Sequence, residues 1–177
     1  MKNIWLFGYG SLIWNPDIPY IDSSIARLNG HVRRFWQGSH DHRGTPKKPG
    51  RVVTLVPCEK GHCDGIAYLV SQKNANSVFQ KLDYREKNGY EKLSINLELS
   101  NNTSQIGVTY VAKENNHAFL GSAPMQSIAS QIISSSGPSG ENKDYLFELA
   151  TALRNYNFID EHIFELESLV KNLVRAP

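Results

Sequence analysis

A short segment near the start of the chain, Gly8-Tyr9-Gly10-Ser11, places a tyrosine and a serine among two glycines. Glycine allows a sharp turn and lets another group approach the backbone closely. The apolar run before the segment is typical of a buried first strand, so the loop after it would present backbone N–H groups that have no strand partner. We expect these donors to hold a small anion or a carboxylate; a plain strand-to-loop turn is the alternative.

Three better-known glycine motifs do not fit this segment. A dinucleotide-binding fingerprint needs a third glycine three residues after Gly10, where the sequence has Ile13. A nucleophile elbow needs glycines two residues before and after its serine, but those positions around Ser11 hold Tyr9 and Ile13. A P-loop ends in Gly-Lys followed by Ser or Thr, which this segment lacks.

A second candidate is the charged segment from Leu82 to Tyr90, with Glu86 at its centre. The spacing of apolar residues predicts a helix over Ser71–Glu86, and Asn88-Gly89 would end it. A carboxylate where a helix ends can reach into a cleft, and burial there would raise its pKa toward that of a useful base. No partner for Glu86 is evident in the sequence, and a solvated charge cluster is the alternative.

The third candidate is a basic stretch with interspersed aromatic residues, from Arg33 to Arg51. Aromatic side chains among arginines can stack on single-stranded nucleic acid, and arginines can equally grip the carboxylates of a small acid. The alternative to a binding site is a solvated strand face with buried aromatic residues between the charges.

Residue types that bind zinc also occur in and after this stretch: His40, His42, Cys58, His62 and Cys63. Their spacing lacks the paired short gaps that structural zinc sites usually have. Hydrogen bonds that hold the long loop to itself are the simpler role for Asp41 and the two histidines of the loop.

The elements that must position these residues divide along the chain. Strand patterns fill the first two thirds, in 24–36, 51–56, 64–70, 93–99 and 106–111 after the first apolar run. Asn29-Gly30 would interrupt the first of these as a turn or a bulge, and 57–61 has the length of a hairpin connection. Helical patterns follow from Ala123 onward. We predict an α+β fold with a helical C-terminal third.

The composition narrows the class of protein further. A length of 177 residues predicts one domain, 1–177, that can bury a proper core. A hydrophobic content of 40% and a net charge of +2 are ordinary for a globular protein and give no sign of a dedicated nucleic-acid binder. The sequence begins without a charged-then-apolar leader and has no run of membrane-spanning length, so we expect a cytoplasmic protein without a membrane partner.

Taken together, these segments resemble the ChaC family of glutathione-specific γ-glutamylcyclotransferases. The similarity runs nearly from end to end and rests on Phe7-Gly8-Tyr9-Gly10-Ser11-Leu12-Ile13-Trp14, Arg33-Arg34-Phe35-Trp36-Gln37-Gly38-Ser39 with Asp41-His42-Arg43-Gly44, Pro49-Gly50-Arg51-Val52-Val53-Thr54-Leu55, Arg85-Glu86-Lys87 with Gly89-Tyr90, and Gly137-Pro138-Ser139-Gly140 with Tyr145-Leu146. One departure is Ser122, because such proteins more often have proline there, and the shape of that loop is left open.

The resemblance implies a small mixed barrel-like sheet with packed helices, no cofactor and no metal. It also implies one reaction, in which the γ-glutamyl amine of glutathione attacks its own side-chain amide and gives 5-oxoproline and cysteinylglycine. The family's substrate loop falls on Tyr9, Gly10, Ser11 and Leu12, and its essential glutamate falls on Glu86. We add Arg43 and Arg51 as expected partners of the glycine carboxylate of the substrate.

The chemistry of the residues agrees with this reaction. A cyclisation needs no second reactant, so the protein has only to fold the substrate and move protons. One carboxylate can take the proton of the ammonium group and later deliver it to the departing nitrogen, while loop N–H groups stabilise the oxyanion. Two rival classes are a nucleic-acid or phosphate-binding module on the basic loop and a zinc-dependent hydrolase using His40, His42 and Cys63.

Overall fold

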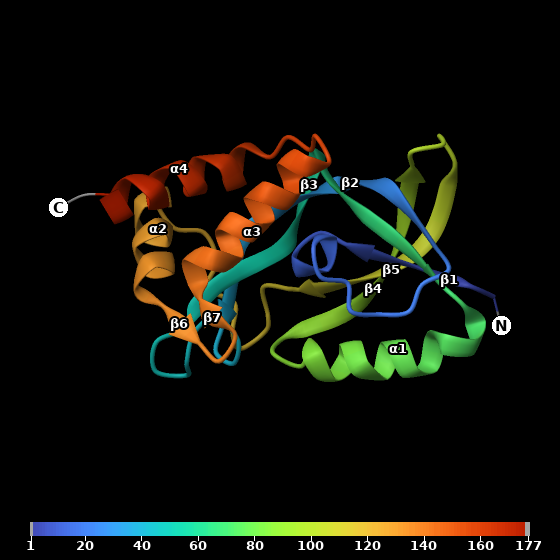
Figure 1. Ribbon diagram of the computed structural model, residues 1–177, viewed down its shortest axis with the longest axis horizontal. Coiled ribbons are helices and arrows are strands. Elements are labelled where there is room, and N and C mark those ends of the chain that lie inside the picture. The colour runs from blue at the N-terminus through green and yellow to red at the C-terminus, as the bar shows by residue number, and fades with distance from the viewer. Residues whose placement is uncertain (1, 176–177) are drawn as a thin grey trace. The chain divides into compact units, whose positions relative to one another are not determined.

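The computed structural model describes residues 2–175 of the chain (Figure 1). Its strands are β1 (Ile4–Gly8), β2 (Asp22–Ser39), β3 (Gly50–Val70), β4 (Tyr90–Leu99), β5 (Ser104–Ala112), β6 (Ser136–Gly137) and β7 (Gly140–Glu141). Its helices are the 3-10 turn η1 (Ser11–Ile13), α1 (Gln72–Arg85), α2 (Met125–Ser134), α3 (Asn142–Asn155) and α4 (Glu161–Arg175). No helix in this described range is long and apolar enough to cross a membrane.

Strands β1 to β5 form a closed barrel in the order β1-β3-β2-β4-β5, and β6 pairs with β7 in a separate small sheet. The barrel is mixed, because β1 is antiparallel to β3, with Phe7 opposite Ala67, and parallel to β5, with Leu6 opposite Val108. Helices α2, α3 and α4 follow the last barrel strand. The α+β class and the barrel-like sheet that the sequence predicted are therefore confirmed.

Internal contacts divide the chain into two compact units. Unit 1 contains the described residues up to Val32 together with Leu55–Lys113, and unit 2 contains Arg33–Thr54 together with the described residues from Glu114 onward. Both units draw on β2 and β3, which run across two of the three boundaries in the sequence. The expectation of one domain stays a prediction.

Helix α1 of unit 1 is capped at both ends by neighbouring residues. The Ser71 hydroxyl accepts the N–H of Asn74 at 3.3 Å and so caps the first turn. At the other end the N–H of Glu86 donates to Leu82 O at 2.8 Å, and Gly89 has a φ of 92°, which lets the chain turn into β4. The predicted helix Ser71–Glu86 therefore differs from the observed Gln72–Arg85 only by its two capping residues.

Unit 2 is held together around helices α2 to α4, drawn from orange to red in Figure 1. Their apolar faces supply a buried core that includes Ile128, Leu149 and Ile163. Asn142 is fully buried at the start of α3, where its amide accepts from Arg51 N–H and donates to Arg51 O, both at 2.7 Å. This pair of bonds fixes α3 to β3 as a strand neighbour would.

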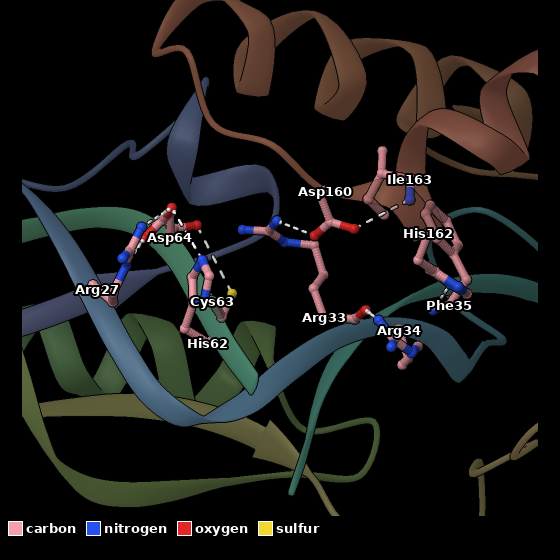
Figure 2. Close-up of polar contacts among 10 residues, drawn as sticks. All are labelled: Arg27, Arg33, Arg34, Phe35, His62, Cys63, Asp64, Asp160, His162 and Ile163. Carbon is pink, nitrogen blue, oxygen red and sulfur yellow. Dashed lines mark hydrogen bonds and ion pairs between the residues drawn. The ribbon is translucent and has the colours of Figure 1, made fainter. Parts of the chain in front are cut away.

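Helix α4 is fixed to β2 by buried polar contacts, shown in Figure 2. Arg33, whose side chain is 1% exposed, pairs with Asp160 at 2.7 Å, and Asp160 also accepts the N–H of Ile163. The Nε2 atom of His162 accepts the N–H of Phe35 at 3.1 Å. Burial and the neighbouring Arg34 charge lower the pKa of His162 to about 4, so this imidazole is neutral near pH 7.

Two sequence expectations for the strands were wrong in detail. The segments 51–56 and 64–70 are one strand, β3, and 57–61 is not a hairpin connection. Residues 57–60 are exposed. Their polar side chains therefore belong to a part of the strand that faces solvent, and not to a turn. In β2 the strand also continues through Asn29-Gly30, where Gly30 has a φ of 78°, so no turn separates two strands there, and the bulge stays a prediction.

The segment around Ser122 leads from β5 into α2. The N–H groups of Leu120 and Gly121 both donate to Trp36 O, at 2.8 and 3.1 Å, which docks the segment on the end of β2. Pro124 then stands as the N-cap of α2. The loop whose shape the sequence left open is thus defined on both sides of Ser122.

Candidate active site

The loop after β1 folds back on its own strand. It forms the turn η1, in which Ile13 N–H donates to Gly10 O at 2.9 Å. The N–H groups of Ser11 and Leu12 precede this first bond of the turn, the position from which backbone donors can face a ligand. Gly8 is needed for the fold-back, because a Cβ there would lie 2.6 Å from the Cβ of Leu12.

Two tyrosine hydroxyls tie this loop to the barrel strands. The hydroxyl of Tyr9 donates to Tyr110 O on β5 at 2.7 Å, and the hydroxyl of Tyr68 on β3 donates to Leu12 O at 2.7 Å. Both tyrosines are buried, with 6% and 4% of their surface exposed. The loop is therefore held rigidly, as a preorganised binding loop must be.

Arg85 joins the loop to the candidate base. Its Nη2 donates to Ser11 Oγ at 2.5 Å, and its Nε lies 3.4 Å from Oε1 of Glu86. The two side chains are partly buried, with 28% of Arg85 and 20% of Glu86 exposed. Glu86 therefore has a cationic neighbour that the sequence did not reveal, and the expectation of a carboxylate with no evident partner was wrong.

Tyr110 and Asp83 form a second polar group beside this carboxylate. The Tyr110 hydroxyl donates to Asp83 Oδ1 at 2.6 Å, and Lys92 Nζ donates to Asp83 Oδ2 at 2.9 Å. Burial raises the pKa of Tyr110, and the bond to Asp83 and the charges of Asp83 and Glu86 raise it further. The hydrogen bonds from Tyr110 and then from Lys92 lower the pKa of Asp83. The phenol therefore keeps its proton and the carboxyl stays ionised near pH 7.

Within unit 1 the structure brings Glu86 close to the predicted substrate loop, because Arg85 contacts both Glu86 and Ser11. The loop consists of Tyr9, Gly10, Ser11 and Leu12. A carboxylate, a guanidinium and backbone donors in one place can shuttle a proton and bind a small polar substrate. The predicted catalytic residue and the predicted substrate loop thus lie on the same side of one unit, at the end of α1 and the end of β1.

Arg43 and Arg51, the remaining predicted site residues, belong to unit 2. The side chain of Arg43 is 15% exposed and lies near Glu148, at 3.6 Å, and over the ring of Tyr145. Arg51 is buried and donates to three uncharged acceptors, at 2.6 to 3.0 Å: Gln131 Oε1, Phe35 O and Gly121 O. Burial lowers the pKa of Arg51. Each arginine therefore has structural contacts within unit 2.

Sequence reasoning missed Arg85, Tyr68, Tyr110 and Lys92 as site residues. Arg85 had a signal, since it directly precedes Glu86 in the segment that resembles the family. The others occupy ordinary strand patterns, and only the closure of the barrel brings them to the loop and the end of α1. Nothing in their local sequence distinguishes them from other strand residues.

The described part of the chain contains no set of side chains that could bind zinc as predicted. Among residues 2–175, no group of three or more His, Cys, Asp or Glu side chains is arranged to hold a metal ion. The ring of His40 stacks on His117 with centroids 6.4 Å apart, and His62 lies 3.8 Å from Asp64. Cys58 and Cys63 are both thiols, the first exposed and the second buried.

The chain is similar to known proteins over nearly its whole length. Residues 4–173 match the family model described as ChaC-like protein. The Arabidopsis thaliana protein named Gamma-glutamylcyclotransferase 2-3 is 39% identical over 97% of this chain and 90% of its own length. The Homo sapiens protein named Glutathione-specific gamma-glutamylcyclotransferase 1 is 37% identical over 97% of this chain and 80% of its own.

A solved structure agrees with the fold as well. The crystal structure of a yeast γ-glutamyl cyclotransferase specific to glutathione aligns with a TM-score of 0.92 and 29% identity, over 97% of both chains. The match of the family model to nearly the whole chain and the identity to relatives of similar length lead to one conclusion. The chain belongs to the ChaC-like protein family.

Proposed function

We propose that this protein is a lyase that cleaves the γ-glutamyl bond of glutathione by intramolecular cyclisation, giving 5-oxoproline and cysteinylglycine. One observation carries the proposal: Arg85 contacts both Ser11 of the loop and the Glu86 carboxylate, so the base and the substrate loop belong to one site. Relatives covering nearly the whole chain that are named glutathione-specific γ-glutamylcyclotransferases support the choice of substrate.

Glu86 acts as the general base and then as the general acid. The α-ammonium group of the substrate gives a proton to the carboxylate, because only the free amine is nucleophilic. The amine nitrogen attacks the γ-carbonyl carbon and closes a five-membered ring. Glu86 gives the proton to the cysteinyl nitrogen and the carbon–nitrogen bond breaks. The freed carboxylate then takes the second proton from the ring nitrogen and passes it to the amine of cysteinylglycine, which leaves as an ammonium ion.

The loop stabilises the charge that develops on the γ-carbonyl oxygen. The N–H groups of Ser11 and Leu12 are the donors, held in place by Tyr68 and by the fold-back at Gly8. Because these donors are fixed before the substrate arrives, little reorganisation is needed when the oxyanion forms. No covalent intermediate is needed, since the nucleophile belongs to the substrate.

Arg85 holds the Glu86 carboxylate in place. Its Nε lies 3.4 Å from Oε1 of Glu86, within ion-pair distance. The same guanidinium holds the Ser11 hydroxyl, so the base and the loop keep a constant separation. Arg85 is therefore a positioning residue in this mechanism.

Arg43 and Arg51 bind the glycine carboxylate of glutathione in this proposal. A guanidinium recognises a carboxylate through two parallel hydrogen bonds, which suits the far end of the tripeptide. In Arg51 the Nε and Nη1 groups already donate to protein acceptors. Arg43 is the better placed of the two, because its bond to Glu141 O is long, at 3.2 Å, and its ion pair is with a half-exposed glutamate.

The proposal includes a single domain that works in the cytoplasm without a cofactor. Cell fractionation with an antibody to the protein tests the location. The reaction itself is tested by incubating the purified protein with glutathione and measuring 5-oxoproline and cysteinylglycine by mass spectrometry. Equal amounts of both products support the cyclisation, whereas free glutamate in place of 5-oxoproline would show hydrolysis and would contradict it.

A further inference from the structure

Asp83 and Tyr110 are linked by a hydrogen bond that the mechanism above does not use. Asp83 lies on the last turn of α1, three residues before Glu86, and its side chain is 46% exposed. Tyr110 lies on β5 and is 6% exposed. The phenol donates to Asp83 Oδ1 at 2.6 Å, which is short for a hydroxyl–carboxylate bond and typical of one with a charged acceptor.

Lys92 completes this arrangement from β4. Its ammonium group donates to Asp83 Oδ2 at 2.9 Å, so the two carboxylate oxygens have different partners. The lysine therefore keeps Asp83 ionised and fixes the direction of the carboxylate oxygen that accepts the hydrogen bond from the phenol. Three elements, α1, β4 and β5, converge on this one carboxylate.

The hydrogen bond decides what the phenol can do toward a ligand. A tyrosine hydroxyl has one proton to donate and lone pairs that accept. Because the phenol proton is directed at Asp83 in this hydrogen bond, the lone pairs of the Tyr110 oxygen are left to accept from a ligand. The Glu86 charge also raises the pKa of this phenol, so the two oxygen acceptors lie within electrostatic reach of each other in unit 1.

We propose that Asp83 is a positioning residue, which holds the Tyr110 hydroxyl so that its oxygen accepts a hydrogen bond from the α-ammonium group of the substrate beside Glu86. This inference rests on the proposed function. Two acceptors around one ammonium group select the γ-glutamyl end of the substrate by its charge and its N–H directions. Asp83 does not itself touch the substrate.

The first test does not depend on activity. The ionisation of Tyr110 is followed by ultraviolet absorbance as the difference between each protein and its Tyr110→Phe partner. With Asp83 present, Tyr110 should stay protonated into the alkaline range, and in Asp83→Ala its ionisation should move to lower pH, because the carboxylate that opposes it is gone. An unchanged titration would overturn the pairing, whatever the substrate of the protein proves to be.

The second test is a double-mutant cycle measured with glutathione. Asp83→Ala should lower kcat/KM about 10- to 100-fold, the range for losing one hydrogen bond to a charged group, and Tyr110→Phe should do the same. Asp83→Ala added to Tyr110→Phe should then change kcat/KM less than about twofold, because Asp83 acts through the phenol. If Asp83→Ala lowers kcat/KM equally in the wild type and in Tyr110→Phe, Asp83 does not act through the Tyr110 hydroxyl, and the proposal is overturned.

Two further proteins keep the result interpretable. Glu91→Ala removes another half-exposed carboxylate of unit 1 that is paired with a lysine, at 2.8 Å, and should leave kcat/KM unchanged. If Asp83→Ala does not fold, Asp83→Asn takes its place, since its amide keeps an acceptor oxygen but loses the charge. Wild-type protein that releases no 5-oxoproline would contradict the proposed function, while the absorbance titration still decides the Asp83–Tyr110 pairing.

Discussion

Glu86 occupies a position that suits a proton shuttle better than a helix interior would. As the C-cap of α1 it has non-helical backbone angles, and its side chain leaves the helix surface where Arg85 and the loop meet. A carboxylate that is one-fifth exposed keeps access to a small substrate and still has a protein partner. Both properties belong to a single residue and can be tested by changing that residue alone.

Glu86→Gln should lower kcat about 10²- to 10⁴-fold, the usual range for loss of a general acid or base. The barrier rises by roughly 3–5 kcal/mol at 1.36 kcal/mol per decade. The amide keeps the size of the side chain but cannot accept the ammonium proton. Release of 5-oxoproline from glutathione is the measurement, with circular dichroism to check the fold.

Glu91→Gln is the matched control for this variant, because Glu91 is also ion-paired in unit 1 but its partner is Lys113 and half of its side chain is exposed. It should retain the activity of the wild type. A folded Glu86→Gln protein within about fivefold of wild type, well below the range for a general base, would remove Glu86 from the mechanism. Asp83 would then be the next carboxylate to examine.

Arg43→Gln should raise KM more than it lowers kcat, since its contact with the glycine carboxylate is far from the reacting bond. Arg51→Gln should raise KM as well and also lower the melting temperature, because it removes the buried bonds to Phe35 O and Gly121 O. Initial rates over a range of glutathione concentrations separate KM from kcat.

Arg27→Gln serves as the arginine control, because Arg27 is paired with Asp64 in unit 1 and half of its side chain is exposed. Its KM should equal that of the wild type. If KM is unchanged in both Arg43→Gln and Arg51→Gln, the basic loop has no part in binding the substrate, and the glycine end is recognised elsewhere.

At the scale of elements, the joint between α4 and β2 depends on a histidine that must stay neutral. His162 accepts a backbone N–H of β2, which a protonated imidazole cannot do. Burial and then the Arg34 charge oppose its protonation most strongly, Asp160 favours it, and Arg33 opposes it by a smaller amount. The attachment of α4 is therefore sensitive to acid, although the helix itself is amphipathic and capped by Asp160.

We expect the free energy of unfolding to fall as the pH is lowered from 6.5 to about 4. The unfolded chain protonates His162 at its ordinary pKa of 6.5, whereas the folded chain resists until about 4, so acid favours the unfolded state throughout this window. A difference of this size corresponds to roughly 2–4 kcal/mol of stability present above pH 6.5. Urea denaturation at several pH values is the measurement.

His162→Gln should weaken this pH dependence, because glutamine has an acceptor oxygen and does not titrate. His117→Gln is the control, since His117 is exposed and its loss should leave the slope between pH 6.5 and 4 as in the wild type. If the free energy of unfolding changes with pH to the same extent in all three proteins, His162 does not cause the acid sensitivity.

At the scale of the whole molecule, the reaction needs no nucleophile from the protein, and the substrate amine is the decisive group. N-acetylglutathione should bind but give no cysteinylglycine, because the acetylated nitrogen cannot attack the γ-carbonyl carbon. The check is mass spectrometry of the products next to a reaction with glutathione. Release of cysteinylglycine from the acetylated compound would establish hydrolysis and would falsify the cyclisation.

The amino-acid sequence by itself determined most elements of this protein and the identity of its main candidate residues. The apolar spacing from Ala75 to Leu82 and the break at Asn88-Gly89 were enough to place α1, because the signals of a helix and its caps are local. The segments containing Ser11 and Glu86 stood out for the same reason, since a glycine-bounded loop and a helix-ending carboxylate are recognisable from neighbouring residues alone.

Only the tertiary structure decided which side chains meet. Closing the barrel puts β1 beside both β3 and β5, which brings Tyr68 and Tyr110 to the loop from far along the chain. The pairing of Arg85 with Ser11 and Glu86 likewise depends on how α1 approaches the loop. Hydrogen bonds between distant residues leave no periodicity in the sequence, because their partners are chosen by strand order and register rather than by spacing along the chain.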